Sequence, residues 1–144
     1  MILIHDSYIK LLEHSSTTHP REACGILAGR TDTDTPIVEC IYETANIAEN
    51  PRREYQIDPS EQLHILEEID QSPHQLIGFY HSHPHGPRKP STRDQHDAQW
   101  DGYYHLLIAN NRGMPYVDAW LWTGDEFKQV PITIESQPST ECTP

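Results

Sequence analysis

The sequence predicts one α/β domain of the α+β kind, in which a mixed β-sheet is flanked by helices. Its 144 residues are the size of an ordinary domain and can bury roughly two-thirds of the surface of the unfolded chain. Segments with helical and with strand periodicity alternate along the chain, as they do when helices pack on a sheet. The last three expected strands follow one another through tight turns, which favours a mixed sheet over a doubly wound parallel one.

A helix followed by a pair of neighbouring strands is expected at the start of the chain. Residues 6–15 carry apolar side chains at helical spacing behind Asp6, a possible cap. Residues 23–29 are short, apolar and end in glycine, whereas residues 36–46 are rich in β-branched side chains and alternate in polarity. Both segments are therefore expected to be strands, joined by the polar turn over residues 30–35.

A second helix is expected after a loop over residues 47–54. Asp58 offers a cap, Pro59 a proline at the first helical position, and Glu61 an acid three residues past the cap. We expect this helix to run to about residue 71. Its buried residues are expected to be Leu63, Leu66 and Ile69.

The second half of the chain predicts one strand, a short helix and then three strands. The first strand covers residues 75–83, and a proline-rich turn separates it from a helix over residues 91–100. The three final strands are separated by Asn-Asn-Arg-Gly and Gly-Asp turns and cover residues 103–109, 115–123 and 126–134. We place the domain at residues 1–134 and expect residues 135–144 to be a mobile tail.

The charge of the chain restricts its partners. Lys and Arg total 10 and Asp and Glu total 22, so the net charge is −12 with histidine neutral. The resulting field repels polyanions, so nucleic acid and anionic membranes are not expected partners. Oligomeric state cannot be inferred from the sequence.

The cysteines and the N-terminus both favour the cytoplasm. Cys24, Cys40 and Cys142 are an odd number at unrelated positions and are expected to be reduced thiols. The first ten residues lack a basic segment followed by a long apolar stretch, and no window is long enough to span a bilayer.

The residues most indicative of chemistry are His81, His83 and Asp94. Side chains two apart on a strand share one face, so both imidazoles can reach one cation while Ser82 points the other way. Asp94 follows a turn that brings the chain back beside the strand end. Two histidines and one carboxylate leave the fourth position of zinc open for water, which is the catalytic arrangement. Ser91 and Asp94 also form an ordinary capping box, and the two interpretations are compatible.

Two segments resemble those of the JAMM, or MPN-plus, metallopeptidases. They are HPREACGILAGR at 19–30 and GFYHSHPHGPRKPSTRDQHDA at 78–98. The family pattern has a glutamate beside the first strand, then H-S/T-H-P and, after seven residues counted from that proline, S-x-x-D, and every element is present here. Asn46, Pro51 and the run at 55–59 are similar to small bacterial members, so the resemblance covers about residues 3–134.

The resemblance implies a cytidine-deaminase-like JAMM/MPN fold and hydrolysis of an isopeptide or peptide bond. It implies one Zn²⁺ per chain at His81, His83 and Asp94, with Glu22 as the general base. Ser91 inherits the role of an oxyanion donor, which is chemically reasonable because a hydroxyl near a metal meets developing negative charge.

The substrate implied by the resemblance is the C-terminal tail of a ubiquitin-like or sulfur-carrier protein, such as a tail ending in Gly-Gly. Only eight residues separate Asp94 from the next strand at Tyr103, too few for the insertions of linkage-specific deubiquitinases. A non-catalytic MPN-type interaction module and a peptidase of cell-wall or phage-tail peptides are the alternatives. His85 and His96 are alternative ligands, although solvent exposure is the commoner fate of such histidines.

Overall fold

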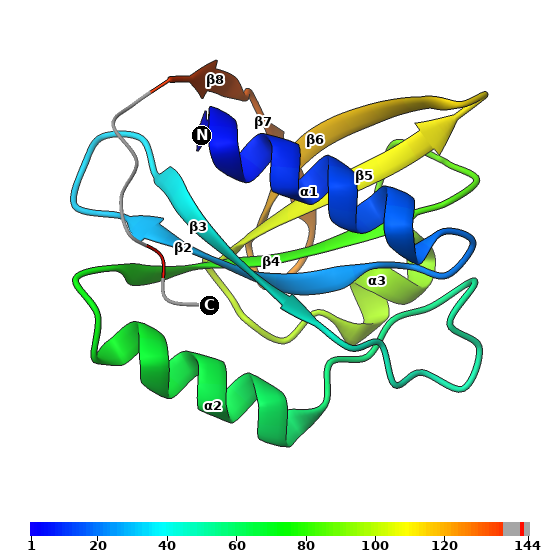
Figure 1. Ribbon diagram of the computed structural model, residues 1–144, viewed down its shortest axis with the longest axis horizontal. Coiled ribbons are helices and arrows are strands. Elements are labelled where there is room, and N and C mark those ends of the chain that lie inside the picture. Colours follow the sequence, from blue (N-terminus) through cyan, green and yellow to red (C-terminus); the bar gives the residue numbers. More distant parts are fainter. Residues whose placement is uncertain (137–141, 143–144) are drawn as a thin grey trace.

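A curved mixed sheet forms the middle of the molecule (Figure 1). The structure is a computed structural model that describes residues 1–136 and Cys142. Within that part of the chain the helices and strands are β1 (Ile2–Ile4), α1 (His5–Thr18), β2 (Cys24–Arg30), β3 (Ile37–Thr44), α2 (Pro59–Asp70), β4 (Gln75–His83), α3 (Thr92–Asp97), β5 (Tyr104–Asn111), β6 (Met114–Trp122), β7 (Phe127–Val130) and β8 (Thr133–Glu135).

The strands of the described residues lie in the order β7-β6-β5-β4-β2-β3-β1-β8. β4 and β5 are parallel, as are β1 and its two neighbours, while the remaining pairs are antiparallel. The predicted mixed sheet is therefore confirmed. β2 and β4 lie side by side at its centre, so the residues that begin β2 and end β4 meet at one end of the sheet.

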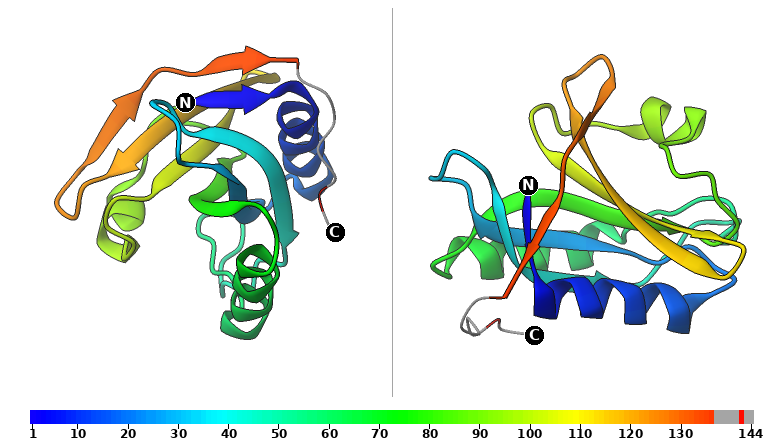
Figure 2. Two further views of the ribbon diagram at one scale, coloured as in Figure 1. Left: turned by 90° about the vertical axis from the view of Figure 1, so that its left-hand side faces the viewer. Right: turned by 90° about the horizontal axis from the view of Figure 1, so that it is seen from above.

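Helices cover both faces of the sheet (Figure 2). On one face α1 packs Leu11 against Leu27 and Tyr80, and on the other α2 packs Ile65 and Ile69 against residues such as Phe79. Because side chains alternate along a strand, Phe79, His81 and His83 of β4 face the α2 side. Tyr80 and Ser82 face the α1 side. The fold thus sends both histidines into the layer between the sheet and α2.

Helix α2 begins as expected, with one error in its buried face. Asp58 is the N-cap and accepts a hydrogen bond from Ser60 N at 3.4 Å. Leu63 was expected to be buried but is 58% exposed, while Ile65 and Ile69 are buried. Ile69 is thus buried as predicted and Leu66 is half-buried, whereas Ile65 is buried in place of Leu63, because apolar side chains occur on more than one side of the helix.

The end of the chain differs from the expected single strand over residues 126–134. β7 pairs with β6 at one edge of the sheet, and β8 pairs with β1 at the opposite edge. Pro131 lies between them, and its carbonyl accepts from the N-terminal amine of Met1 at 2.8 Å. Proline cannot continue a hydrogen-bonded ladder, which separates the two strands. β1 itself has three residues and is too short to give a periodic signal.

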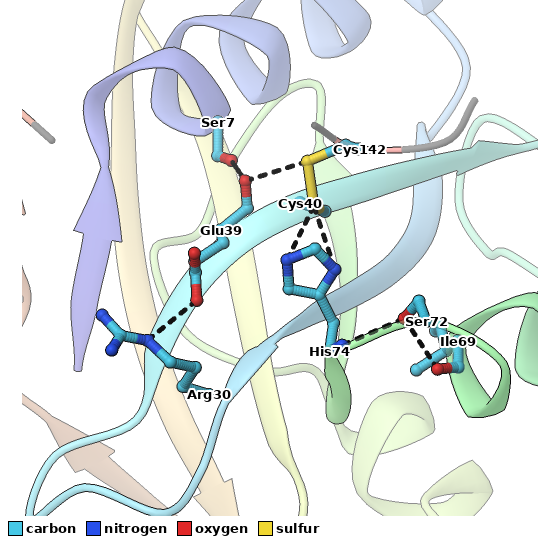
Figure 3. The surroundings of a disulfide bond; sticks show 8 residues. All are labelled: Ser7, Arg30, Glu39, Cys40, Ile69, Ser72, His74 and Cys142. Atoms are coloured by element: carbon cyan, nitrogen blue, oxygen red, sulfur yellow. Dashed lines mark hydrogen bonds and ion pairs between the residues drawn. A yellow bond between two sulfur atoms is a disulfide. The ribbon is translucent and has the colours of Figure 1, made fainter. Parts of the chain in front are cut away.

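The expectation of three reduced thiols is wrong for two cysteines. Cys40 and Cys142 form a disulfide with a Cα–Cα distance of 5.7 Å (Figure 3). Cys24 has a free thiol and is buried. Cys40 faces the α2 side of β3, where the buried His74 ring lies 3.8 Å from its sulfur. The pairing spans 102 residues, so spacing along the sequence could not indicate it.

The expected mobile tail over residues 135–144 lies mostly outside the described residues. Two residues differ from that expectation: Glu135 ends β8, and Cys142 is bonded to Cys40. The domain boundary at residue 134 and the cytoplasmic location stay predictions. Among the described residues no helix has the length and apolarity needed to cross a membrane.

Candidate active site

His81 and His83 end β4 and point their Nε2 atoms toward each other. The two nitrogens lie 3.3 Å apart, and both residues are buried. β2 flanks β4 on one side and β5 on the other, so the backbone that carries the imidazoles cannot shift without breaking two ladders. Ser82 points to the opposite face as expected, and its Oγ accepts from Ala23 N at 2.8 Å.

Asp94 reaches both histidines from the first turn of α3. Its Oδ2 lies 3.1 Å from the Nε2 of His81 and 3.1 Å from the Nε2 of His83. The capping box that positions it is formed: Asp94 N donates to Ser91 Oγ at 3.0 Å, and Ser91 N donates to Asp94 Oδ2 at 2.7 Å. The same residues therefore begin the helix and bring a carboxylate to the histidines.

Contacts on the far side of each imidazole set its orientation. His83 Nδ1 lies 2.9 Å from the carbonyl of Pro87. A carbonyl only accepts, so Nδ1 carries the proton and Nε2 of the neutral ring has a free lone pair. The ring of Tyr55 stacks on His81 at 4.4 Å with an interplanar angle of 20°. His81 Nδ1 is buried without a hydrogen-bond partner among the described residues.

The three converging atoms fit a tetrahedral metal ion. Ligand atoms about 2.0–2.1 Å from tetrahedral zinc lie roughly 3.3 Å from one another. His81 Nε2, His83 Nε2 and Asp94 Oδ2 are 3.1–3.3 Å apart in all three pairs. Two nitrogens and one carboxylate oxygen are also a donor set that suits zinc.

Glu22 completes the group from the residue before β2. One of its carboxylate oxygens and one ring nitrogen from each histidine lie within 4.8 Å of one another, so these side chains too could hold a metal ion. Glu22 is 4% exposed, and its Oε1 has no hydrogen-bond partner among the described residues. The shorter distances of Asp94 favour that residue as the third ligand and leave Glu22 beside the ion.

The electrostatics differ sharply between the two carboxylates. Burial raises the pKa of Glu22 to about 7, a rise that the charge of His83 opposes and those of Asp94 and Glu54 assist. Burial alone would also raise the pKa of Asp94. There, however, in the metal-free protein with protonated imidazoles, the charge of His81, hydrogen bonds from the Nε2–H groups of both rings and one from Ser91 N hold the pKa of Asp94 well below its usual range. Asp94 is therefore a permanent anion, and Glu22 can exchange a proton near neutral pH.

The loop that precedes α2 holds the backbone of Glu22. Glu22 N donates to Pro51 O at 2.7 Å, and Asn46 Nδ2 donates to Glu22 O at 3.0 Å. The same amide donates to Glu54 O at 3.0 Å and accepts from Ala48 N and Gln56 N. The sequence suggested Asn46 only through the family resemblance, since its role depends on a folded loop.

A cleft of about 530 Å³ adjoins Asp94 on the α2 side of the sheet. Aromatic side chains form part of its wall, and charged groups stand at its edge. Arg93 pairs with Glu54 at 2.9 Å and with Asp97 at 3.2 Å, which links α3 to the loop before α2. The lining includes Tyr55, Phe79, Trp100 and His105.

The two alternative histidine ligands lie elsewhere. The ring of His85 packs edge-on against His19 at 5.3 Å. The side chain of His96 is 87% exposed and contacts Asp97. The structure thus brings together Glu22, His81, His83, Ser91 and Asp94, and it leaves His85 and His96 outside the group.

Comparison with known proteins gives one family for most of the chain. Residues 5–123 match the family described as prokaryotic homologs of the JAB domain. A desampylase from Haloferax volcanii is 40% identical over 116 residues, which cover 81% of this chain and 80% of that protein. A probable TtuB-protein conjugate cleaving protease from Thermus thermophilus is 36% identical over 81 residues, or 56% of this chain and 51% of that protein.

Solved structures share the fold. A solution structure of a protein from Desulfitobacterium hafniense has a TM-score of 0.85 at 29% identity and covers 95% of this chain and 94% of its own. The JAB1/MPN domain protein AF2198 from Archaeoglobus fulgidus has a TM-score of 0.57 at 16% identity, covering 94% of this chain and 97% of its own. At that identity the likeness shows the fold alone.

Proposed function

Since this chain belongs to the family of prokaryotic JAB-domain proteins and is a hydrolase of the peptidase class, we propose that it cleaves an amide bond with the help of zinc. His81, His83 and Asp94 hold the ion. The observation that carries the proposal is the convergence of their three ligand atoms at 3.1–3.3 Å, beside the buried carboxylate of Glu22.

Zinc supplies Lewis acidity, which makes water more acidic and polarises a scissile carbonyl. The protein supplies the proton transfer. Glu22 lies within 4.8 Å of the ligand nitrogens, where its carboxylate can accept a proton from the attacking water and pass it to the departing amine. In the metal-free protein, burial raises the pKa of Glu22 to about 7; a bound cation would lower it, which favours the carboxylate form that accepts the proton.

Ser91 supplies a hydroxyl to the developing oxyanion. Its Oγ accepts from Asp94 N, which leaves the hydroxyl hydrogen free to be donated. Because the capping box fixes the serine in the same turn as Asp94, the donor stays beside the ligand group throughout the reaction. A preorganised donor of this kind stabilises charge that appears only in the transition state.

The substrate that we propose is a protein conjugate of a ubiquitin-like carrier, attached through an extended C-terminal tail. The Haloferax relative is named for removing such a modifier and the Thermus relative for cleaving TtuB conjugates. The cleft beside Asp94 supports an extended chain, because loop and helix walls line it and its volume is about 530 Å³. A tail ending in Gly-Gly has no side chains to collide with those walls.

The decisive experiment compares Asp94 with an aspartate far from the site. A carrier with a Gly-Gly tail, joined to a lysine of a second protein, is incubated with the wild type, Asp94→Asn and Asp6→Asn in zinc-containing buffer. Asp6 is exposed in the first turn of α1, on the other face of the sheet, so its variant controls for the substitution. We expect cleavage by the wild type and Asp6→Asn, with loss of zinc and activity in Asp94→Asn.

Two outcomes would contradict the proposal. Full cleavage after removal of zinc by a chelator would exclude the ion, and zinc-loaded Asp94→Asn that cleaves at the wild-type rate would exclude this ligand set. The same carrier sequence within a folded domain serves as a second substrate. Equal cleavage of that substrate would exclude recognition of an extended tail.

A further inference from the structure

The loop between β4 and α3 carries the carbonyl that orients His83. Pro87 O accepts the Nδ1–H of His83 at 2.9 Å, and this bond keeps Nε2 directed at His81 and Asp94. Pro87 and the two residues after it are exposed, so packing of their own side chains does not hold the carbonyl in place. Another contact must fix this part of the loop.

Arg88, the next residue, is tied to the sheet. Its Nε lies 3.0 Å from Asp118 Oδ2 and its Nη2 lies 3.1 Å from Asp118 Oδ1, which is the bidentate geometry typical of a guanidinium and a carboxylate. The guanidinium carbon also lies 4.1 Å from the centre of the Tyr116 ring. The two hydrogen-bonded contacts with Asp118 and the stacking on Tyr116 together hold the Arg88 side chain in this position.

Asp118 is a rigid anchor that lies on the same face as the site. It stands opposite Leu107 in the β5–β6 ladder, and Leu107 stands opposite His81 in the β4–β5 ladder. These three residues form one row across the sheet, two strand spacings or about 10 Å long. Asp118 is 8% exposed, and Gln129 on β7 donates to its Oδ1 at 3.3 Å, so the carboxylate is held from both sides.

We propose that the Arg88–Asp118 pair is a positioning device for His83. The pair fixes the loop, the loop fixes the Pro87 carbonyl, and the carbonyl fixes the tautomer and direction of the imidazole. Arg88 is thus a positioning residue and touches no reacting atom. The inference rests on the proposed metal site, because His83 is one of its ligands.

A second ion pair provides a closely matched control. Arg30 Nε lies 3.0 Å from Glu39 Oε1, with side-chain exposures of 47% and 8% (Figure 3). Arg88 Nε lies 3.0 Å from Asp118 Oδ2, with exposures of 49% and 10%. Arg30 ends β2 at the end of the sheet opposite the histidines. Arg88→Gln and Arg30→Gln therefore each remove an arginine–carboxylate pair of similar exposure, one beside the loop and one far from it.

Zinc affinity is measured by competition with a chromogenic chelator. The proteins compared are the wild type, Arg88→Gln, Asp118→Asn and Arg30→Gln, and circular dichroism first shows that each is folded. Losing a group that orients a metal ligand typically costs a factor of 10 to 100 in affinity. Arg88 acts through one intervening residue, so we expect a loss of about 10-fold for Arg88→Gln and Asp118→Asn. Arg30→Gln should match the wild type.

An NMR measurement on the metal-free protein separates positioning from a general loss of stability. The Nδ1–H of His83, hydrogen-bonded to Pro87 O, gives a slowly exchanging imidazole signal that should broaden or vanish in Arg88→Gln and persist in Arg30→Gln. Wild-type affinity and an unchanged imidazole signal in Arg88→Gln would overturn the inference. Wild type that binds no zinc would overturn the proposed metal site instead, and the imidazole signal would still decide the role of Arg88.

Discussion

Replacing Glu22 by glutamine should stabilise the metal-free protein at pH 8 and should abolish most of the activity of the zinc-loaded protein. The carboxylate is buried and its Oε1 has no hydrogen-bond partner among the described residues. Burial raises its pKa from 4.5 to about 7, so between those values the folded protein binds more protons than the unfolded chain. The free energy of unfolding therefore falls as the pH rises through this range. Glutamine does not ionise, so the variant does not lose the free energy that burying a charged carboxylate takes from the wild type.

The size of the effect follows from the shift. A rise from 4.5 to about 7 corresponds to about 3 kcal/mol at a pH above 7, since one pKa unit is about 1.4 kcal/mol. The amide of glutamine brings a neutral donor that also needs a partner, at a cost of about 1 kcal/mol. The expected net effect is thus a gain of about 2 kcal/mol at pH 8 and a loss of less than about 1 kcal/mol at pH 4.5, where little but the cost of the amide is left.

Denaturant unfolding in the presence of a chelator measures this gain for Glu22→Gln against wild type at pH 4.5, 6 and 8. Glu49→Gln, an exposed substitution in the loop before α2, should follow the wild type. Turnover of the zinc-loaded variant should fall by about 10² to 10⁴, the effect of losing a general base, with its zinc content unchanged. If the difference in free energy of unfolding between Glu22→Gln and the wild type does not grow with pH, the buried Glu22 carboxylate does not destabilise the folded protein when it ionises, and the reasoning is refuted. Wild-type turnover would place the base elsewhere.

Three further changes test other parts of the molecule. Ser91→Ala should lower the rate of single-turnover cleavage by a factor of about 10² to 10³ through loss of an oxyanion donor. In denaturant unfolding, the same variant should lose about 1 kcal/mol through loss of the α3 cap. Cys142→Ser opens a covalent loop spanning 102 residues and should lower the free energy of unfolding by about 4–5 kcal/mol without reductant; excess reductant should destabilise the wild type and leave the variant unchanged. Burial lowers the pKa of His105 to about 4, so the unfolded chain takes up a proton first and stability falls as the pH drops from 6.5 to 4. Relative to His105→Phe, the metal-free wild type should lose up to about 3 kcal/mol over that range, and parallel pH profiles would contradict this.

That His81, His83 and Asp94 lie together was predictable, because the sequence information that brings them together is local. His81 and His83 are two residues apart on a strand of nine residues with a buried pattern, and Ser91 and Asp94 are the two ends of a capping box. Each pair needs only the periodicity of one element to put its side chains on one side. The pattern cannot say how close the pairs come, and the 3.1 Å contacts of Asp94 with both histidines depend on how the loop between them folds.

The edges of the sheet were not predictable for the opposite reason. β1 and β8 have three residues each and pair with each other from the two ends of the described chain. Neither is long enough to show a period, and the position of both depends on the pairing of β1 with β3. The Cys40–Cys142 disulfide has the same character, since it joins β3 to a residue 102 positions away.

The contacts that support the site could not be predicted from the sequence, although the residues of the site could. Asp118 pairs with Arg88 across 30 residues, and Ser82 accepts from the backbone of Ala23, beside Glu22, across 59 residues. Neither contact involves a metal-binding or proton-transferring group, so neither requires an unusual residue type that a sequence pattern would reveal. Both contacts depend on the sheet, which places Asp118 in the same row as His81 and places the start of β2 beside the end of β4. A chain that kept His81, His83 and Asp94 but lacked Asp118 on β6 would therefore have the same donor atoms, while the orientation of the His83 imidazole would be less well defined.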